Sequence, residues 1–193
     1  MGLSILQIIE LFASLSAAIG ATLIMFPRRS GWLFLLMSGL LYIFIFGYNK
    51  LYATLALQLG FASLSLYGLI SWSKKSQAPQ DFCPLIYSPL YILRDLSLAA
   101  LGSFLWAELL AHVTDDPHPY WDGTLSIYAM LAQYWMSRAY LCHWILWLVA
   151  DGAYATSLFC WGLPMSGLLY AYLALLSIVG LFHWSRILRQ KRA

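Results

Sequence analysis

Four residues in the C-terminal third of the sequence combine aromatic rings with a carboxylate. Trp144, Trp147 and Asp151 stand at i, i+3 and i+7, and Tyr154 follows three residues later. On a helix these positions share one face. Indole faces attract cations and a carboxylate supplies a counter-charge, so this face is a candidate receptor for a flat cationic ring. The alternative is that the tryptophans anchor or pack the helix, which leaves a carboxylate in an apolar run unexplained.

Other polar side chains interrupt apolar stretches elsewhere. Asp122, Ser126 and Gln133 form a stripe at i, i+4 and i+11, whereas Ser38 and Gln58 each stand within their own apolar run. Each of these groups could hydrogen-bond a solute, and each could instead tie two helices together. We therefore treat Gln58, Gln133 and Ser38 as further candidate binding residues.

The residues that commonly hold metals or perform catalysis have no matching pattern. The histidines, His112, His118, His143 and His183, lack metal-ligand spacing, and the three cysteines are scattered. No nucleophile elbow, zinc-protease motif or phosphate-binding glycine loop is present. We expect no cofactor, no metal and no nucleic-acid partner. An intramembrane enzyme would need Asp122 and Asp151 as an acid pair, but they lie on different helices at different expected depths.

The elements that position these residues are predicted to be transmembrane helices. The 193-residue chain is 62% hydrophobic and 10% charged, with a mean hydropathy of +0.72. A bilayer span needs about 20 apolar residues. Breaks at charges and turn formers then delimit seven spans, near residues 4–26, 31–48, 51–72, 92–112, 121–137, 140–159 and 166–184.

Lysine and arginine predict the direction of insertion, because they are retained on the cytoplasmic side. With the N-terminus outside, only Lys50 falls in an outer loop. Ten of the 11 basic residues then lie inside: Arg28, Arg29, Lys74, Lys75, Arg94, Arg138, Arg186, Arg189, Lys191 and Arg192. An even number of spans would destroy this asymmetry.

A constant offset of 112 residues relates the two halves of the chain. It pairs Glu10 with Asp122, Trp32 with Trp144, Gly68 with Gly180, Trp72 with Trp184, Ser73 with Ser185 and Lys74 with Arg186. We therefore predict one membrane domain over residues 1–193. It contains a first repeat near 4–72, a linker helix near 92–112 and a second repeat near 121–184, and the two repeats are parallel. Glu10 and Asp122 are expected to bind neighbouring donors near the outer face.

Several of these residues resemble motifs of the PnuC family of bacterial vitamin transporters. Leu51-Tyr52-Ala53 with Gln58, Tyr67-Gly68 and Trp72 resemble the third helix of that family. Trp121-Asp122, Ser137-Arg138 and Trp144-x-x-Trp147 resemble its fifth and sixth helices, and Gly180 to Trp184 its last. The resemblance covers nearly the whole chain apart from the inner loop and the fourth span.

The resemblance implies a three-plus-one-plus-three fold like a full-length SWEET protein, assembled as a homotrimer in the bacterial inner membrane. It implies energy-independent facilitated diffusion, made one-way by a cytoplasmic vitamin kinase. The best-known members carry nicotinamide riboside, and relatives carry thiamine or riboflavin. By motif position, Trp144, Trp147 and Gln58 correspond to solute contacts.

Two positions depart from the nicotinamide riboside pattern. Where that pattern has asparagines, this chain has Asp151 and Ser38. Both vitamins are cationic, so Asp151 alone does not separate them. The loss of both amides slightly favours thiamine, whose aminopyrimidine and thiazolium suit a carboxylate and an aromatic cage. Nicotinamide riboside is the alternative within the family, and a sensor subunit is an alternative outside it.

The basic asymmetry generates a first testable prediction. A topology reporter fused after Ala193 should be active only in the cytoplasm, because the inner loops and tail hold ten of the 11 basic residues. Paired cytoplasmic and periplasmic reporters at that position make the measurement. Activity confined to the periplasm would refute the orientation.

Overall fold

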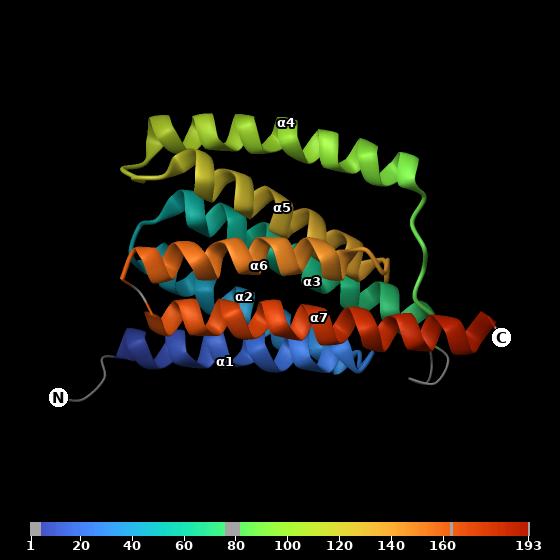
Figure 1. The fold of residues 1–193 in the computed structure, drawn as a ribbon. Helices are drawn as coiled ribbons and strands as arrows, with labels where there is room; N and C mark the ends of the chain where they lie inside the picture. Colours follow the sequence, from blue (N-terminus) through green and yellow to red (C-terminus); the bar gives the residue numbers. More distant parts are fainter. Residues whose placement is uncertain (1–4, 76–81, 163, 193) are drawn as a thin grey trace. The chain divides into compact units, whose positions relative to one another are not determined.

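The computed structural model describes residues 5–75, 82–162 and 164–192, and within them every regular element is a helix. Seven helices follow one another (Figure 1): α1 (Ile5–Met25), α2 (Ser30–Tyr48), α3 (Tyr52–Lys75), α4 (Pro89–Val113), α5 (Pro119–Ser137), α6 (His143–Cys160) and α7 (Pro164–Arg192). The predicted all-α class is confirmed. Positions 4, 76–81 and 163, which belong to predicted spans and breaks, lie outside the described residues.

Local chemistry explains where these helices begin and end. Three helices start with proline, at Pro89, Pro119 and Pro164, where the missing N–H has no intrahelical acceptor to lose. After α5 the backbone turns left-handed at Ala139, with φ of 63°, and the Tyr140 amide donates to Trp135 O at 3.0 Å. This capping pattern ends α5 and explains why α6 begins at His143, three residues later than the predicted span.

The helices extend past the predicted apolar spans at two places. α3 continues to Lys75, and α7 continues to Arg192, eight residues beyond the predicted end at Trp184. Buried Leu188 keeps this part of α7 packed, and basic residues in its last turn favour the negative end of the helix dipole. The prediction located the apolar stretch, and the helix is longer than that stretch.

Five of the seven helices are long and apolar enough to cross a membrane, as judged by length and composition: α1, α2, α3, α4 and α7. α5 and α6 are not in this set. They carry several of the polar residues that the sequence analysis selected, including Asp122 and Asp151. These two helices also hold most of the candidate binding residues.

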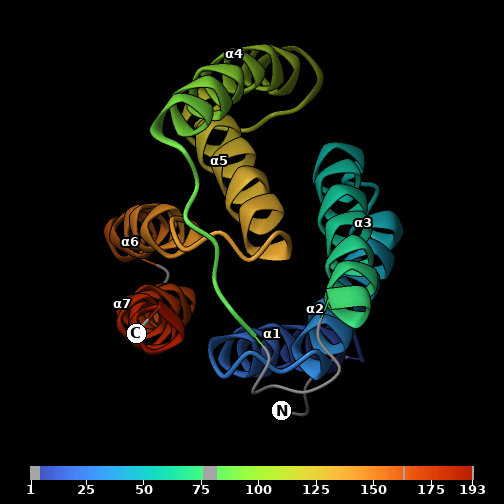
Figure 2. The same cartoon turned by 90° about the vertical axis from the view of Figure 1, so that its right-hand side faces the viewer.

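The chain divides into two compact units, Met1–Phe82 and Cys83–Ala193. In the first unit α2 packs against both α1 and α3. In the second, packing follows chain order, with α4 on α5, α5 on α6 and α6 on α7 (Figure 2). The predicted single domain with repeats near 4–72 and 121–184 around a linker helix stays a prediction.

Each unit contains a tryptophan ring packed flat on a glycine. A Cβ atom on Gly68 would lie 2.5 Å from the Trp32 ring, and one on Gly180 would lie 2.6 Å from the Trp144 ring. Trp32 also meets Trp72 edge-on, with ring centroids 5.5 Å apart at 78°. Trp32 with Trp144 and Gly68 with Gly180 are two of the sequence pairs related by the 112-residue offset.

The second unit repeats this geometry. Trp144 meets Trp184 edge-on, with centroids 5.4 Å apart at 87°. The same offset also relates two hydrogen-bonded pairs: Ser14 Oγ lies 2.7 Å from Tyr42 Oη, and Ser126 Oγ lies 3.5 Å from Tyr154 Oη. Contacts of the same kind therefore recur at equivalent positions of the two units.

The glycine packing gives a second prediction. Gly68→Ala and Gly180→Ala should each lower the free energy of unfolding by about 1–3 kcal/mol, because the new methyl group would overlap a tryptophan ring. Unfolding in detergent, followed by heat or denaturant, measures the effect.

Gly102→Ala is the matched control, since its Cβ would sit 3.6 Å from Ile127 in ordinary contact. Helix propensity predicts a neutral effect or a gain of up to about 1 kcal/mol there. If all three variants behaved alike, the close approach of ring and glycine would not limit stability.

Candidate functional site

The candidate receptor face belongs to α6 and begins at its first turn. Trp144 is 3% exposed and Asp151 is 4% exposed, whereas Trp147 and Tyr154 are partly exposed. The three positions Trp144, Trp147 and Asp151 share a helix face, as their spacing predicted. Their exposures differ, so the two tryptophans occupy different environments.

Trp144 is part of the α6–α7 packing. Its ring covers Gly180, meets Trp184 edge-on and lies 4.4 Å from the His143 ring, measured between centroids. This is the packing role that the sequence analysis left open for the tryptophans. Trp147 makes no such ring contact with a described residue, and part of its surface is accessible. Trp147 is therefore the better placed of the two to offer a ring face to a ligand.

Both indole N–H groups of this face lack acceptors. Trp144 Nε1 and Trp147 Nε1 are buried and have no hydrogen-bond partner in the described part of the chain. A buried donor without an acceptor costs about 1–3 kcal/mol. The first half of α6 thus presents two donors that a ligand or a water could satisfy.

The Asp151 carboxylate is buried, whereas the next position on α6, Gly152, is open. No hydrogen bond or ion pair joins it to any residue that the structure describes. A Cβ atom added at the next residue, Gly152, would meet nothing within 4 Å. A buried carboxylate needs a proton, a cation or donors to offset its desolvation. Asp151 therefore lacks, among the described residues, the partners that would identify it as part of a structural hydrogen-bond cluster.

Two of the other predicted residues belong to α6 and α5 of the same unit. Tyr154 hydrogen-bonds Ser126 of α5 at 3.5 Å, and its ring lies 5.0 Å from that of Tyr170 on α7. Gln133 is 4% exposed on α5. Tyr154 links all three helices of this part of the second unit, so it can both contact a solute and hold the helices in register.

The remaining predicted residues lie elsewhere in the chain. Ser38 (5% exposed) and Gln58 (partly exposed) belong to the first unit, as does the exposed Glu10. Asp122 stands in the first turn of α5 and is partly exposed. Among the described residues, no group of three or more His, Cys, Asp and Glu side chains could hold a metal ion.

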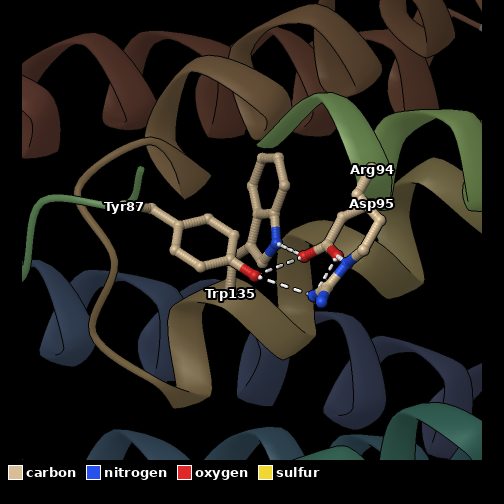
Figure 3. Close-up of polar contacts among 4 residues, drawn as sticks. All are labelled: Tyr87, Arg94, Asp95 and Trp135. Carbon is tan, nitrogen blue, oxygen red and sulfur yellow. Dashed lines mark hydrogen bonds and ion pairs between the residues drawn. The ribbon is translucent and has the colours of Figure 1, made fainter. Parts of the chain in front are cut away.

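Sequence reasoning missed a buried polar cluster centred on Asp95 (Figure 3). Asp95 Oδ2 accepts hydrogen bonds from Tyr87 Oη at 2.8 Å and from Trp135 Nε1 at 3.0 Å. Asp95 Oδ1 accepts two from Arg94, at 2.7 and 3.0 Å. The signal available in the sequence was the adjacent Arg94 and Asp95 within the predicted span near 92–112.

Comparison with known proteins now defines the class. The sequence profile of the nicotinamide mononucleotide transporter family matches residues 7–186. The nicotinamide riboside transporters PnuC of Escherichia coli strain K12 and Shigella flexneri are each 20% identical over 208 aligned residues, covering 95% of this chain and 87% of theirs. A crystal structure of the vitamin B3 transporter PnuC superposes with a TM-score of 0.75 at 19% identity, over 94% of this chain and 82% of that one.

These matches describe a multi-pass membrane transporter. The chain belongs to the nicotinamide mononucleotide transporter family, the PnuC family of vitamin transporters, which confirms the resemblance seen in the sequence. Its relatives are transporters and not enzymes, so the intramembrane-enzyme alternative is set aside.

The unpaired state of Asp151 gives a third prediction. Asp151→Asn should leave the melting temperature of the ligand-free protein unchanged or raise it, because no hydrogen bond with a described residue is lost and a buried charge is removed. Asp95→Asn is the matched contrast. This variant replaces a carboxylate whose two oxygens both accept hydrogen bonds, and it should lower the free energy of unfolding by about 2 kcal/mol or more. A large loss of stability in Asp151→Asn would make Asp151 structural.

Proposed function

We propose that this chain carries nicotinamide riboside across the membrane by facilitated diffusion. The observation that carries the proposal concerns the first half of α6. Among the described residues, its two buried indole N–H donors have no acceptors, and the buried carboxylate that follows them has no partner. Nicotinamide riboside offers a pyridinium cation, a carboxamide and ribose hydroxyls. The cation and hydroxyls suit Asp151, and the oxygen atoms suit the indole donors.

The relatives support this solute over thiamine, because the named ones are nicotinamide riboside transporters. The preference for thiamine drawn from the sequence finds no support among them. One observation keeps thiamine as the second candidate: Asp151 is an acid where the riboside pattern has an amide. A carboxylate pairs more strongly with an aminopyrimidine and a thiazolium than an amide does.

The candidate contacts differ in their roles. We propose Trp147 and Asp151 as direct solute contacts, with Tyr154 and Gln133 as hydrogen-bonding groups and Trp144 as a packed wall whose N–H faces the solute. Ser38 and Gln58 remain candidate contacts from the first unit. The supporting facts are the partial exposure of Trp147, the burial of Asp151 and the packing of Trp144 on Gly180.

We also infer that α1–α3 and α5–α7 are parallel repeats joined by α4, in the three-plus-one-plus-three order of a full-length SWEET protein. The matching Trp-on-Gly contacts and Ser–Tyr hydrogen bonds, all 112 residues apart, support this inference. The remaining parts of the proposal are a homotrimer in the bacterial inner membrane, the N-terminus outside, and a cytoplasmic kinase that traps the vitamin. The absence of a nucleotide-binding motif from the sequence supports transport without ATP.

Binding and uptake with purified protein give the fourth prediction. Wild-type protein should bind nicotinamide riboside more tightly than thiamine, and Trp147→Ala should weaken riboside binding at least about tenfold by removing the exposed ring. Asp151→Asn should weaken thiamine binding at least about tenfold and riboside binding less, because the riboside pattern has asparagine at this position. Calorimetric titration measures affinity, and proteoliposome uptake without ATP measures transport.

A surface aromatic provides the control for these titrations. Trp121→Ala removes an exposed tryptophan on α5 and should leave both affinities unchanged. Binding of neither vitamin by folded wild-type protein would refute the proposed solute class. Uptake against a gradient that collapses with a protonophore would refute facilitated diffusion.

A further inference from the structure

Three parts of the second unit converge on the Asp95 carboxylate, which is 8% exposed. Asp95 itself comes from α4, Tyr87 from the segment that leads into α4, and Trp135 from the last turn of α5. Figure 3 shows the Tyr87 hydroxyl and the Trp135 indole pointing at the same carboxylate, with Arg94 on its other side. Both carboxylate oxygens are therefore occupied by donors, as a buried charge requires.

The segment that leads into α4 also contacts the turn between α5 and α6. Leu85 N donates to Ala139 O at 2.8 Å, and Leu141 N donates to Leu85 O at 2.9 Å, which makes a short parallel bridge. The Tyr87 ring stacks on Tyr140, with centroids 4.1 Å apart at 12°. Two backbone bonds and a stacked ring thus hold a turn whose own conformation is unusual, with Ala139 at positive φ.

This turn continues directly into the candidate receptor face. His143 Nδ1 donates to Tyr140 O at 2.6 Å, and the His143 ring lies between Trp144 and Trp184, at 4.4 and 4.8 Å between centroids. A chain of contacts therefore runs from Asp95 through Tyr87 and Tyr140 to the first turn of α6. The position of that turn sets where Trp147 and Asp151 lie along the helix.

We propose that Asp95 is a positioning residue for transport: with Tyr87 and Trp135 it fixes the start of α6 and thereby the solute-binding face. The expected effect of Asp95 on vitamin affinity rests on the proposed function. Its expected effect on the start of α6 rests on the contacts alone. Partial burial and the hydrogen bond to Asp95 raise the pKa of Tyr87 to about 12, so its hydroxyl remains a donor at any physiological pH.

Conservative variants test the role. Tyr87→Phe and Trp135→Phe each remove one donor and keep a ring. Each should raise the KM for nicotinamide riboside about three- to tenfold with Vmax little changed, because the face is displaced while the transporter still cycles. In the double variant the KM should rise by less than the product of the two single increases, because both donors act through one carboxylate. Amide hydrogen exchange of residues 139–147 should become faster in each variant.

Tyr128→Phe is the matched control. Its hydroxyl donates to Leu96 O at 3.3 Å, so it also joins α5 to α4, but it does not touch the Asp95 cluster. This variant should keep the KM and the exchange rates of residues 139–147.

The outcomes separate the two proposals. Unchanged exchange in Tyr87→Phe and Trp135→Phe would overturn the positioning role, whichever vitamin binds. Faster exchange with an unchanged KM would also overturn it, because the cluster would then be structural only. If wild-type protein bound neither vitamin, the proposed function would fail, and the exchange rates would still decide whether Asp95 holds the start of α6.

Discussion

The packing of a tryptophan ring on a glycine is the contact on which each unit depends. Trp32 on Gly68 joins α2 to α3, and Trp144 on Gly180 joins α6 to α7. Helices in lipid gain little from hydrophobic burial, so close packing on small residues supplies much of their association. A large flat ring on a residue without a side chain brings two helices together over a wide area. It also fixes their register, because a Cβ at the glycine would overlap the ring.

The two units use this common packing for different chemistry. Gly39 of α2 packs closely on Ala62, with its Cβ position 3.3 Å from the alanine methyl. The residue 112 positions later is Asp151, a buried carboxylate with no partner among the described residues. A helix contact in the first unit thus corresponds to a candidate binding group in the second.

Two carboxylates of the second unit, those of Asp95 and Asp151, are buried and therefore lose their hydration. They differ in whether hydrogen-bond donors offset that loss. Asp95 is surrounded by donors from Tyr87, Arg94 and Trp135, so its charge is stabilised within the protein. Asp151 is also buried but has no such donor among the residues that the structure describes. A buried charge that already has its donors is stabilised within the fold, whereas one without donors stays costly until a proton, a cation or a donor reaches it. The same residue type therefore completes a hydrogen-bonded cluster in α4 and is left as a candidate binding group in α6.

Sequence reasoning was sufficient for the all-helical membrane class, the approximate positions of the helices, the shared face of Trp144, Trp147 and Asp151, and the family. It could do so because a lipid solvent imposes long apolar runs, and because helical spacing is a local property. Tertiary contacts, which the sequence does not reveal, leave Trp147 partly accessible while Trp144 is packed. They also supply donors to Asp95 and, among the described residues, none to Asp151. These outcomes depend on partners far away in the chain, such as Trp135, 40 residues from Asp95. No local pattern specifies which of two buried carboxylates will meet its donors.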